Sequence, residues 1–217
     1  MTRAVTVSKS SVSAVPAVAA ATAGPPPAAE ASMTIARLID LLDFDEPAGK
    51  HVREGMTVVQ SASALAEALL WPDAIKVMAH ALDKPTAVRW AVECVVGVDG
   101  NAVSLSDLGR AALDAAGRWA GESTEVNRRA AQAAAERAGF DTPAGCCALA
   151  AFLSGGSLAP PGIASIPPAP HLTAATVASA VILAAVVDAP AEAPVRFQRF
   201  FNAALRKVRP LASGSPA

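Results

Sequence analysis

The side chains best suited to chemistry in this sequence are three cysteines and three histidines. They are Cys94, Cys146, Cys147, His51, His80 and His171. A cysteine nucleophile needs a histidine or a cation that holds the thiolate, and the sequence around the cysteine pair offers none. A thiol enzyme would require Cys146 to meet His80 or His171 through folding, and we keep this as the alternative function. The odd cysteine count and the adjacent pair favour buried, reduced thiols in a cytoplasmic protein.

Sequence motifs for other chemistries are absent. The chain has no CxxC, HxxxH or HExxH metal pattern, no GxSxG serine motif and no GxxxxGK[ST] phosphate loop. Carboxylates cluster at Asp40, Asp43, Asp45 and Glu46, where we expect them to keep one helix end solvated. We therefore expect no catalytic residue, no metal ion and no cofactor.

Binding is the better interpretation of the remaining signals, because aromatic and arginine side chains are the usual anchors of protein interfaces. The candidates lie around two tryptophans, in a glycine- and proline-rich segment and on a basic C-terminal helix. They are Trp71, Arg89, Trp90, Glu93, Gly155, Gly156, Pro160, Pro161, Arg196 and Arg199. Each has a structural alternative: a tryptophan can fill a core, glycines can end a helix, and arginines near a helix C-terminus complement its dipole.

The charge of the chain narrows the class of partner. Its formal net charge is −1, although all charged residues after Glu192 are basic. One short basic helix face without interleaved aromatic residues offers few phosphate contacts, so we expect no nucleic acid. We expect a protein partner and leave the oligomeric state open.

Small side chains dominate the elements that must position these residues. Hydrophobic residues make up 53% of the chain and charged residues 17%, and much of the apolar content is alanine, which lets helix backbones approach closely. Apolar residues recur with helical spacing, and most helices have a candidate N-cap. These caps are Ser61 or Ser63, Asp83, Ser104 or Ser106, Ser123 or Thr124, Asp141 or Thr142, and Thr173.

The helix predicted from Thr173 to Val187 is apolar on all sides, so we expect it to be surrounded by other helices. Its apolar stretch is shorter than the ~20 residues of a bilayer span, and we expect no membrane span. The segment before it contains five prolines between Pro160 and Pro170. Its simplest role is to end a helix and turn the chain, and a surface role is the alternative, because connections of this length are uncommon unless functional.

These patterns predict one all-α domain. We expect a compact bundle of about eight helices over residues 33–209, built like helical hairpins but without a fixed repeat period. Residues 1–32, which are rich in alanine and proline, and residues 210–217 are expected to be disordered tails.

Four segments carry a resemblance to a known family. They read WPDAIKVMAHAL, AVRWAVECV, EVNRRAAQAAAERAGFDTPAGCCALAAFLSGGSLAPPG and HLTAATVASAVILAAV. In their order they resemble an uncharacterised bacterial family of small alanine-rich helical proteins, which we associate loosely with gene neighbourhoods of type VI secretion systems. The resemblance spans most of residues 71–187 and implies a helical fold and a secretion-related context, but it assigns no residue a function. We therefore expect a non-enzymatic adaptor or accessory factor of such a secretion system.

Overall fold

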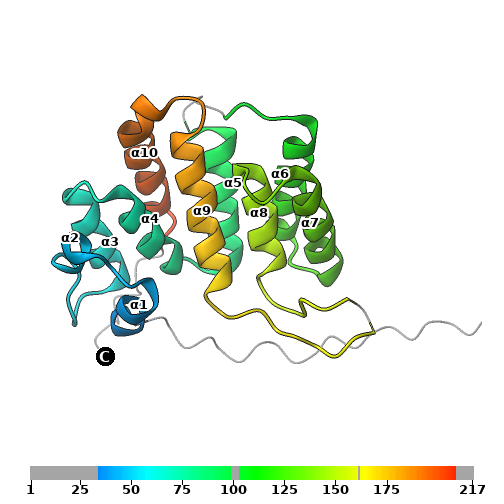
Figure 1. The fold of residues 1–217 in the computed structure, drawn as a ribbon, viewed down its shortest axis with the longest axis horizontal. Helices are drawn as coiled ribbons and strands as arrows, with labels where there is room; N and C mark the ends of the chain where they lie inside the picture. Colours follow the sequence, from blue (N-terminus) through cyan, green and yellow to red (C-terminus); the bar gives the residue numbers. More distant parts are fainter. Residues whose placement is uncertain (1–33, 99–102, 161, 209–217) are drawn as a thin grey trace, which may run out of the picture. The chain divides into compact units, whose positions relative to one another are not determined.

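The computed structural model describes residues 34–98, 103–160 and 162–208. These residues form ten α-helices and include a short 3-10 helix, with no strand among them, which confirms the all-α prediction (Figure 1). The elements are α1 (Ile35–Leu42), α2 (Glu46–Gly49), α3 (Val58–Glu67), α4 (Trp71–His80), α5 (Lys84–Val96), α6 (Asp107–Gly121), α7 (Glu125–Ala138), α8 (Pro143–Phe152), α9 (Leu172–Val186), η2 (Pro190–Glu192) and α10 (Ala193–Leu205). The tails predicted at 1–32 and 210–217 lie outside the described residues.

Hydroxyl and carboxylate side chains begin most of these helices. The N-caps of α5, α6, α7 and α8 are Asp83, Ser106, Thr124 and Thr142. Each accepts a hydrogen bond from the backbone N–H three residues further on, as predicted. The predicted start of α3 at Ser61 or Ser63 is wrong. Thr57 and Gln60 form a capping box, which begins the helix at Val58.

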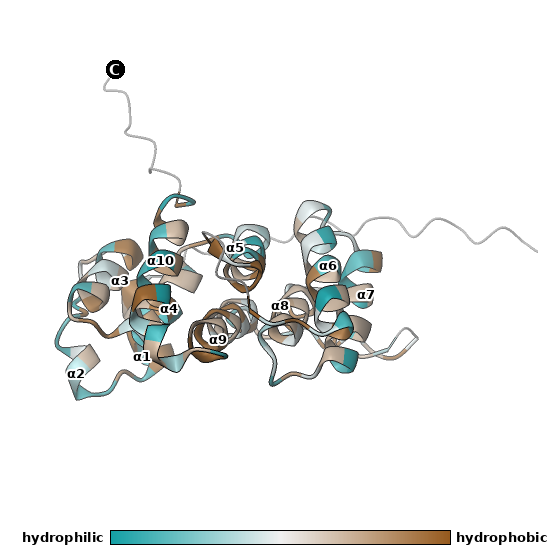
Figure 2. Ribbon diagram, turned by 90° about the horizontal axis from the view of Figure 1, so that it is seen from above, coloured by the Kyte–Doolittle hydropathy of each residue, from teal (hydrophilic) through white to brown (hydrophobic). Residues whose placement is uncertain are grey.

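Helix α9 lies among four other helices. It packs against α4, α5, α8 and α10, and both views place it beside α5 and α8 (Figures 1 and 2). Val177 and Val181 are fully buried. Ala175, Ser179 and Val186 are exposed along one edge of the helix, so the prediction that α9 has neighbours on every side is wrong for that edge.

No single helix among the described residues has both the length and the apolar composition of a membrane span. Helices α9 and α10 meet the criterion only together, as a pair bent by 112°.

Alanines make the contacts among α6, α7 and α8, which pack on one another in all three pairings. Fully buried examples are Ala112, Ala116, Ala131, Ala135 and Ala148. One close approach joins Gly139, the C-cap of α7, to the first turn of α8, where a Cβ added to Gly145 would lie 1.8 Å from the carbonyl oxygen of Gly139. The backbone that ends α7 therefore meets α8 without room for any side chain at Gly145.

Larger side chains fill the space where α10 meets α4 and α5. Phe197, Phe200 and Phe201 are buried on one face of α10. The ring of Phe201 meets that of Trp71 in an edge-on arrangement, with ring centroids 6.4 Å apart. The core thus combines tightly packed alanines around α8 with aromatic residues around α10.

Candidate functional site

The connection between α8 and α9, residues 153–171, is a long segment that we call the α8–α9 loop (yellow in Figure 1). Part of it closes on itself. The backbone N–H of Leu158 donates to the carbonyl of Ile166 at 2.8 Å. The hydroxyl oxygen of Ser157 accepts hydrogen bonds from the N–H groups of Ala159 and Ile166, both at 3.1 Å. These bonds join residues 157–159 to Ile166 and bring the two ends of this part of the loop together.

Two arginines of α7, Arg128 and Arg129, fix the base of this loop, and we call them the arginine clamp. Arg128 Nη2 donates to the Ser157 carbonyl at 3.0 Å. Arg129 Nη2 donates to the carbonyls of Ser157 at 2.8 Å and Ala159 at 2.7 Å. Charged donors thus hold the carbonyls of Ser157 and Ala159, and with them the base of the loop, in place against α7.

Glu125 and Phe152 hold the clamp itself. The guanidinium of Arg128 makes a two-pronged ion pair with Glu125, at 2.5 and 2.8 Å, and lies 4.7 Å from the centre of the Phe152 ring. Arg129 pairs with the same carboxylate at 2.9 Å. These hydrogen bonds lower the pKa of Glu125. Arg128 is only 3% exposed, so its charge needs these partners.

Three successive carbonyls at the C-terminal end of α8 accept hydrogen bonds from side chains on three different helices. They are Phe152 O from Arg128 on α7 at 2.7 Å, Leu153 O from Thr173 on α9 at 3.1 Å, and Ser154 O from Lys84 on α5 at 2.9 Å. The last carbonyls of a helix have no partner within it. Thr173, expected to be the cap of α9, therefore lies within that helix and caps α8 instead.

The two predicted glycines of the loop differ in role. Gly156 has φ +65°, and a Cβ added there would lie 2.9 Å from Cζ, Nε and Nη2 of Arg128. Gly155 has open space around the same position. Gly156 is therefore required for the close approach of the backbone to the arginine clamp, whereas Gly155 is not.

Beyond its base, the loop exposes apolar side chains. Ile163 is 64% and Ile166 55% exposed. Pro160 is also exposed, and Pro161 lies outside the described residues. The exposed isoleucines were not among the predicted candidates, because a helical pattern search gives no signal in a segment of turns.

The predicted tryptophans lie in or beside the core. Trp90 is 0% exposed and its indole N–H donates to the carbonyl of Phe200 at 2.9 Å. Trp71 is half-buried against Phe201. Trp90 is therefore a core residue that ties α5 to α10, and its prediction as a surface anchor is corrected.

The predicted charged residues mainly hold the fold. Arg89 donates to the carbonyl of Ala120 at 2.7 Å, at the C-terminal end of α6. Arg196 is 7% exposed and donates to the carbonyl of Val187 at 2.9 Å, just beyond α9. The prediction that Arg196 lies on a solvent-exposed basic face of the C-terminal helix is therefore wrong.

The other two members of the predicted set, Glu93 and Arg199, lie on α5 and α10 respectively. Glu93 forms an ion pair with Lys207 at 2.7 Å, which joins α5 to the end of α10. Arg199 is half-buried on α10. The Glu93–Lys207 ion pair and the buried Trp90 do not share a surface with the α8–α9 loop.

The cysteines show no feature of an activated nucleophile. Cys146 is buried, and its thiol donates to the carbonyl of Phe140 at 3.1 Å. Burial and the Asp141 carboxylate raise the pKa of Cys146, whereas a nucleophilic thiolate needs a lowered pKa. Burial also raises the pKa values of Cys94 and Cys147.

The histidines do not supply the missing base. Burial and the nearby His171 lower the pKa of His80 to about 4. His80 therefore stays neutral at physiological pH. The groups that act on the Cys146 thiol are the backbone carbonyl of Phe140 and the carboxylate of Asp141. Within the described part of the chain, no three histidine, cysteine, aspartate or glutamate side chains gather as a metal site requires.

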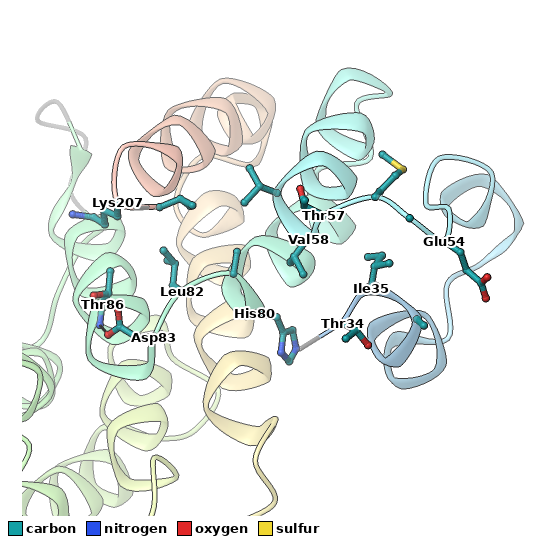
Figure 3. A pocket seen from close by; sticks show the side chains of 16 residues that line it. Thr34, Ile35, Glu54, Thr57, Val58, His80, Leu82, Asp83, Thr86 and Lys207 are labelled. Carbon is teal, nitrogen blue, oxygen red and sulfur yellow. Dashed lines mark hydrogen bonds between the residues drawn. The ribbon is translucent and has the colours of Figure 1, made fainter. Parts of the chain in front are cut away.

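A cavity of about 950 Å³ lies beside α1 and α3 (Figure 3). These two helices are at the end of the bundle away from α6 and α7 (Figure 2). We call this cavity the α1/α3 cavity, because the starts of α1 and α3 line it together with the turn between α4 and α5 and the end of α10. Its apolar lining includes Ile35, Met56, Val58, Leu82 and Val208, and its polar lining includes Glu54, His80, Asp83, Thr86 and Lys207. Sequence reasoning missed this site because four distant segments form it.

Comparison with known proteins gives a family. The profile of DUF6931, a family of unknown function, matches residues 61–207. No curated protein and no solved structure matches the chain. The matched range contains the arginine clamp and the α8–α9 loop, while one wall of the α1/α3 cavity precedes it. The chain belongs to the DUF6931 family of unknown function.

Proposed function

We propose that this protein is a non-enzymatic protein-binding module that contacts its partner through the α8–α9 loop. One observation carries the proposal: Ile163 and Ile166 are 64% and 55% exposed on a loop whose base is fixed by charged hydrogen bonds. Exposed apolar side chains on an ordered loop are typical of interaction sites.

The fixed base favours binding for a thermodynamic reason. Ordering a flexible loop on association costs free energy, and a loop already held in place avoids most of that cost. Burial of each exposed isoleucine in an interface would contribute about 1 kcal/mol or more. Two such residues would therefore account for roughly 30-fold or more in affinity.

The sequence resemblance supplies the context for the partner. We place the protein in the cytoplasm as an adaptor or accessory factor of a type VI-like secretion system, and we place its partner among the components of that system. The buried free thiols of Cys94, Cys146 and Cys147 suit a reducing compartment.

A cross-linking experiment in host cells tests the proposal. A photoreactive amino acid replaces Ser165, which is exposed between the two isoleucines, and the cross-linked proteins are identified by mass spectrometry. The same experiment is repeated with Ile163→Ser/Ile166→Ser. We expect a secretion-system component to be cross-linked by the first protein and lost, or reduced at least tenfold, with the double variant.

The matched control changes two apolar residues elsewhere on the surface. Val126 is 78% and Leu108 48% exposed, so Val126→Ser/Leu108→Ser removes similar surface outside the loop. This control must keep the cross-link. Equal yields from all three proteins would show that the loop does not bind the partner.

A further inference from the structure

We propose that residues 166–170 of the α8–α9 loop present a polyproline II helix, which the partner protein binds in a groove lined by tryptophan or tyrosine rings. These residues read IPPAP, and we call them the proline segment. The inference rests on the proposed function of the loop and adds to it the chemistry of the partner.

The covalent structure of the proline segment restricts its backbone to an extended form. Proline rings fix φ at about −65° in three of its five residues. Ile166, Pro167 and Ala169 each precede a proline, whose ring disfavours the α-helical region for the residue before it. In the structure, residues 164–169 contain no helix, strand or turn. These restrictions together favour polyproline II, the conformation of proline-rich recognition motifs.

The exposure of the segment follows the geometry of such a helix. Polyproline II has about three residues per turn, so each residue shares an edge with the third residue after it. Pro167 and Pro170 lie on one edge, Ile166 and Ala169 on a second, and all four are exposed, whereas Pro168 is half-buried. The loop runs beyond the ends of α8 and α9 (yellow in Figure 1). Two edges of the segment are therefore accessible to the groove of a partner.

The hydrogen-bonding groups of the segment do not suit the other common way of binding an extended chain, which is pairing with a strand of the partner. Its prolines have no N–H, and the N–H of Ile166 already donates to Ser157 Oγ at 3.1 Å. Only the N–H of Ala169 is left for a partner. The carbonyls of Pro167 and Pro168 accept no hydrogen bond from any described residue. Free acceptors with almost no donors match the indole N–H and phenol O–H groups of an aromatic groove.

Contacts at both ends hold the segment in place before a partner binds. At its start, the carbonyl of Ile166 accepts from the N–H of Leu158 at 2.8 Å, and at its end the carbonyl of Ala169 accepts from the N–H of Leu172 at 3.1 Å. A stiff, anchored ligand loses little conformational entropy on association. The α8–α9 loop contains no aspartate, glutamate, lysine or arginine, so its recognition depends on rings and carbonyls instead of ion pairs.

Cross-linking of the full chain in host cells, from a photoreactive residue in place of Ser165, gives the readout. The variant Pro167→Ala/Pro170→Ala removes two exposed rings and keeps both isoleucines of the loop. We expect it to lower the yield of the cross-linked partner at least about tenfold, because two apolar contacts are lost and the segment becomes flexible. The matched control, Pro190→Ala/Pro194→Ala, changes two exposed prolines outside the loop and must keep the cross-link.

A competition experiment tests the same groove without any change in the proline segment. A short oligoproline peptide, which adopts polyproline II but has no isoleucine, is added to a lysate of the host cells before irradiation. At about millimolar concentration we expect it to lower the cross-link at least about threefold. A glycine–serine peptide of the same length, which is flexible and has no rings, must leave the cross-link unchanged.

Two results would overturn the inference. The first is a cross-link that Pro167→Ala/Pro170→Ala leaves unchanged, and the second is a cross-link that oligoproline does not reduce. If Ile163→Ser/Ile166→Ser still removes the cross-link in that case, the proposed function stands and only the polyproline II mode fails. If the isoleucine variant also keeps the cross-link, the proposed function itself fails, so the two failures are distinguishable.

Discussion

Replacing Gly156 by alanine is expected to destabilise the protein much more than replacing its neighbour Gly155. The reason is the contact between the backbone of Gly156 and the buried guanidinium of Arg128. A Cβ at Gly156 would lie 2.9 Å from three guanidinium atoms, whereas a Cβ at Gly155 would meet nothing within 4 Å. Two adjacent glycines in one loop therefore give a test and its control.

The expected loss in free energy of unfolding for Gly156→Ala has two contributions. Gly156 has φ +65°, and a residue with a Cβ in this left-handed region costs about 1 kcal/mol. Displacing the guanidinium weakens its bonds to the carbonyls of Phe152 and Ser157, at 2.7 and 3.0 Å. The loss of one charged hydrogen bond adds about 2 kcal/mol. We expect a total of about 3 kcal/mol, which corresponds to a fall in Tm of roughly 6–12 °C.

Urea unfolding followed by circular dichroism measures this difference. Gly155→Ala should change the free energy of unfolding by less than about 0.5 kcal/mol. In an Arg128→Met background, where the charged bonds are already lost, Gly156→Ala should cost only the backbone contribution of about 1 kcal/mol. The reasoning is refuted if the two glycine variants unfold at the same urea concentration, or if the Arg128→Met background leaves the cost of Gly156→Ala unchanged.

Three further outcomes follow from buried groups. Trp90→Phe removes the indole donor to the carbonyl of Phe200 and leaves a cavity where the larger ring was, so the free energy of unfolding should fall by about 2 kcal/mol; an unchanged urea midpoint would contradict this. His80 has a lowered folded pKa, so the unfolded chain takes up the proton first and stability should decrease as the pH falls from 6.5 to about 4. In His80→Gln this part of the decrease should disappear, and identical pH profiles would refute the assignment. Cys146 should react with iodoacetamide more slowly in the folded protein than in urea at about pH 8.5; equal rates would show an accessible, normal thiol.

Local sequence signals predicted the helices and many of their ends. Ser106, Thr124 and Thr142 cap the helices they were expected to cap, because an N-cap bond joins residues only three positions apart and is visible in the sequence. The start of α3 was misplaced because two serines, Ser61 and Ser63, fit the same rule as Thr57. In such cases the rule alone does not choose between candidates.

The functional surfaces were less predictable because they depend on which helices meet. The sequence shows that Arg196 and Trp90 lie on helices, but not that Arg196 reaches the end of α9 or that Trp90 bonds to α10. The arginine clamp had a visible local signal: Glu125 lies three and four residues before Arg128 and Arg129, the spacing of helical ion pairs. The contact of the arginine clamp with the α8–α9 loop had no such signal in the sequence.

The three side chains that seal the end of α8 link its unfolding to that of its neighbours. Since these donors come from α5, α7 and α9, the last turn of α8 cannot fray without breaking bonds to each of them. Amide protons of these helices should therefore exchange with solvent in one concerted opening, at the free energy of global unfolding, rather than helix by helix. We therefore expect α8, an alanine-rich helix that alone would be only marginally stable, to belong to the slowest-exchanging unit of the protein.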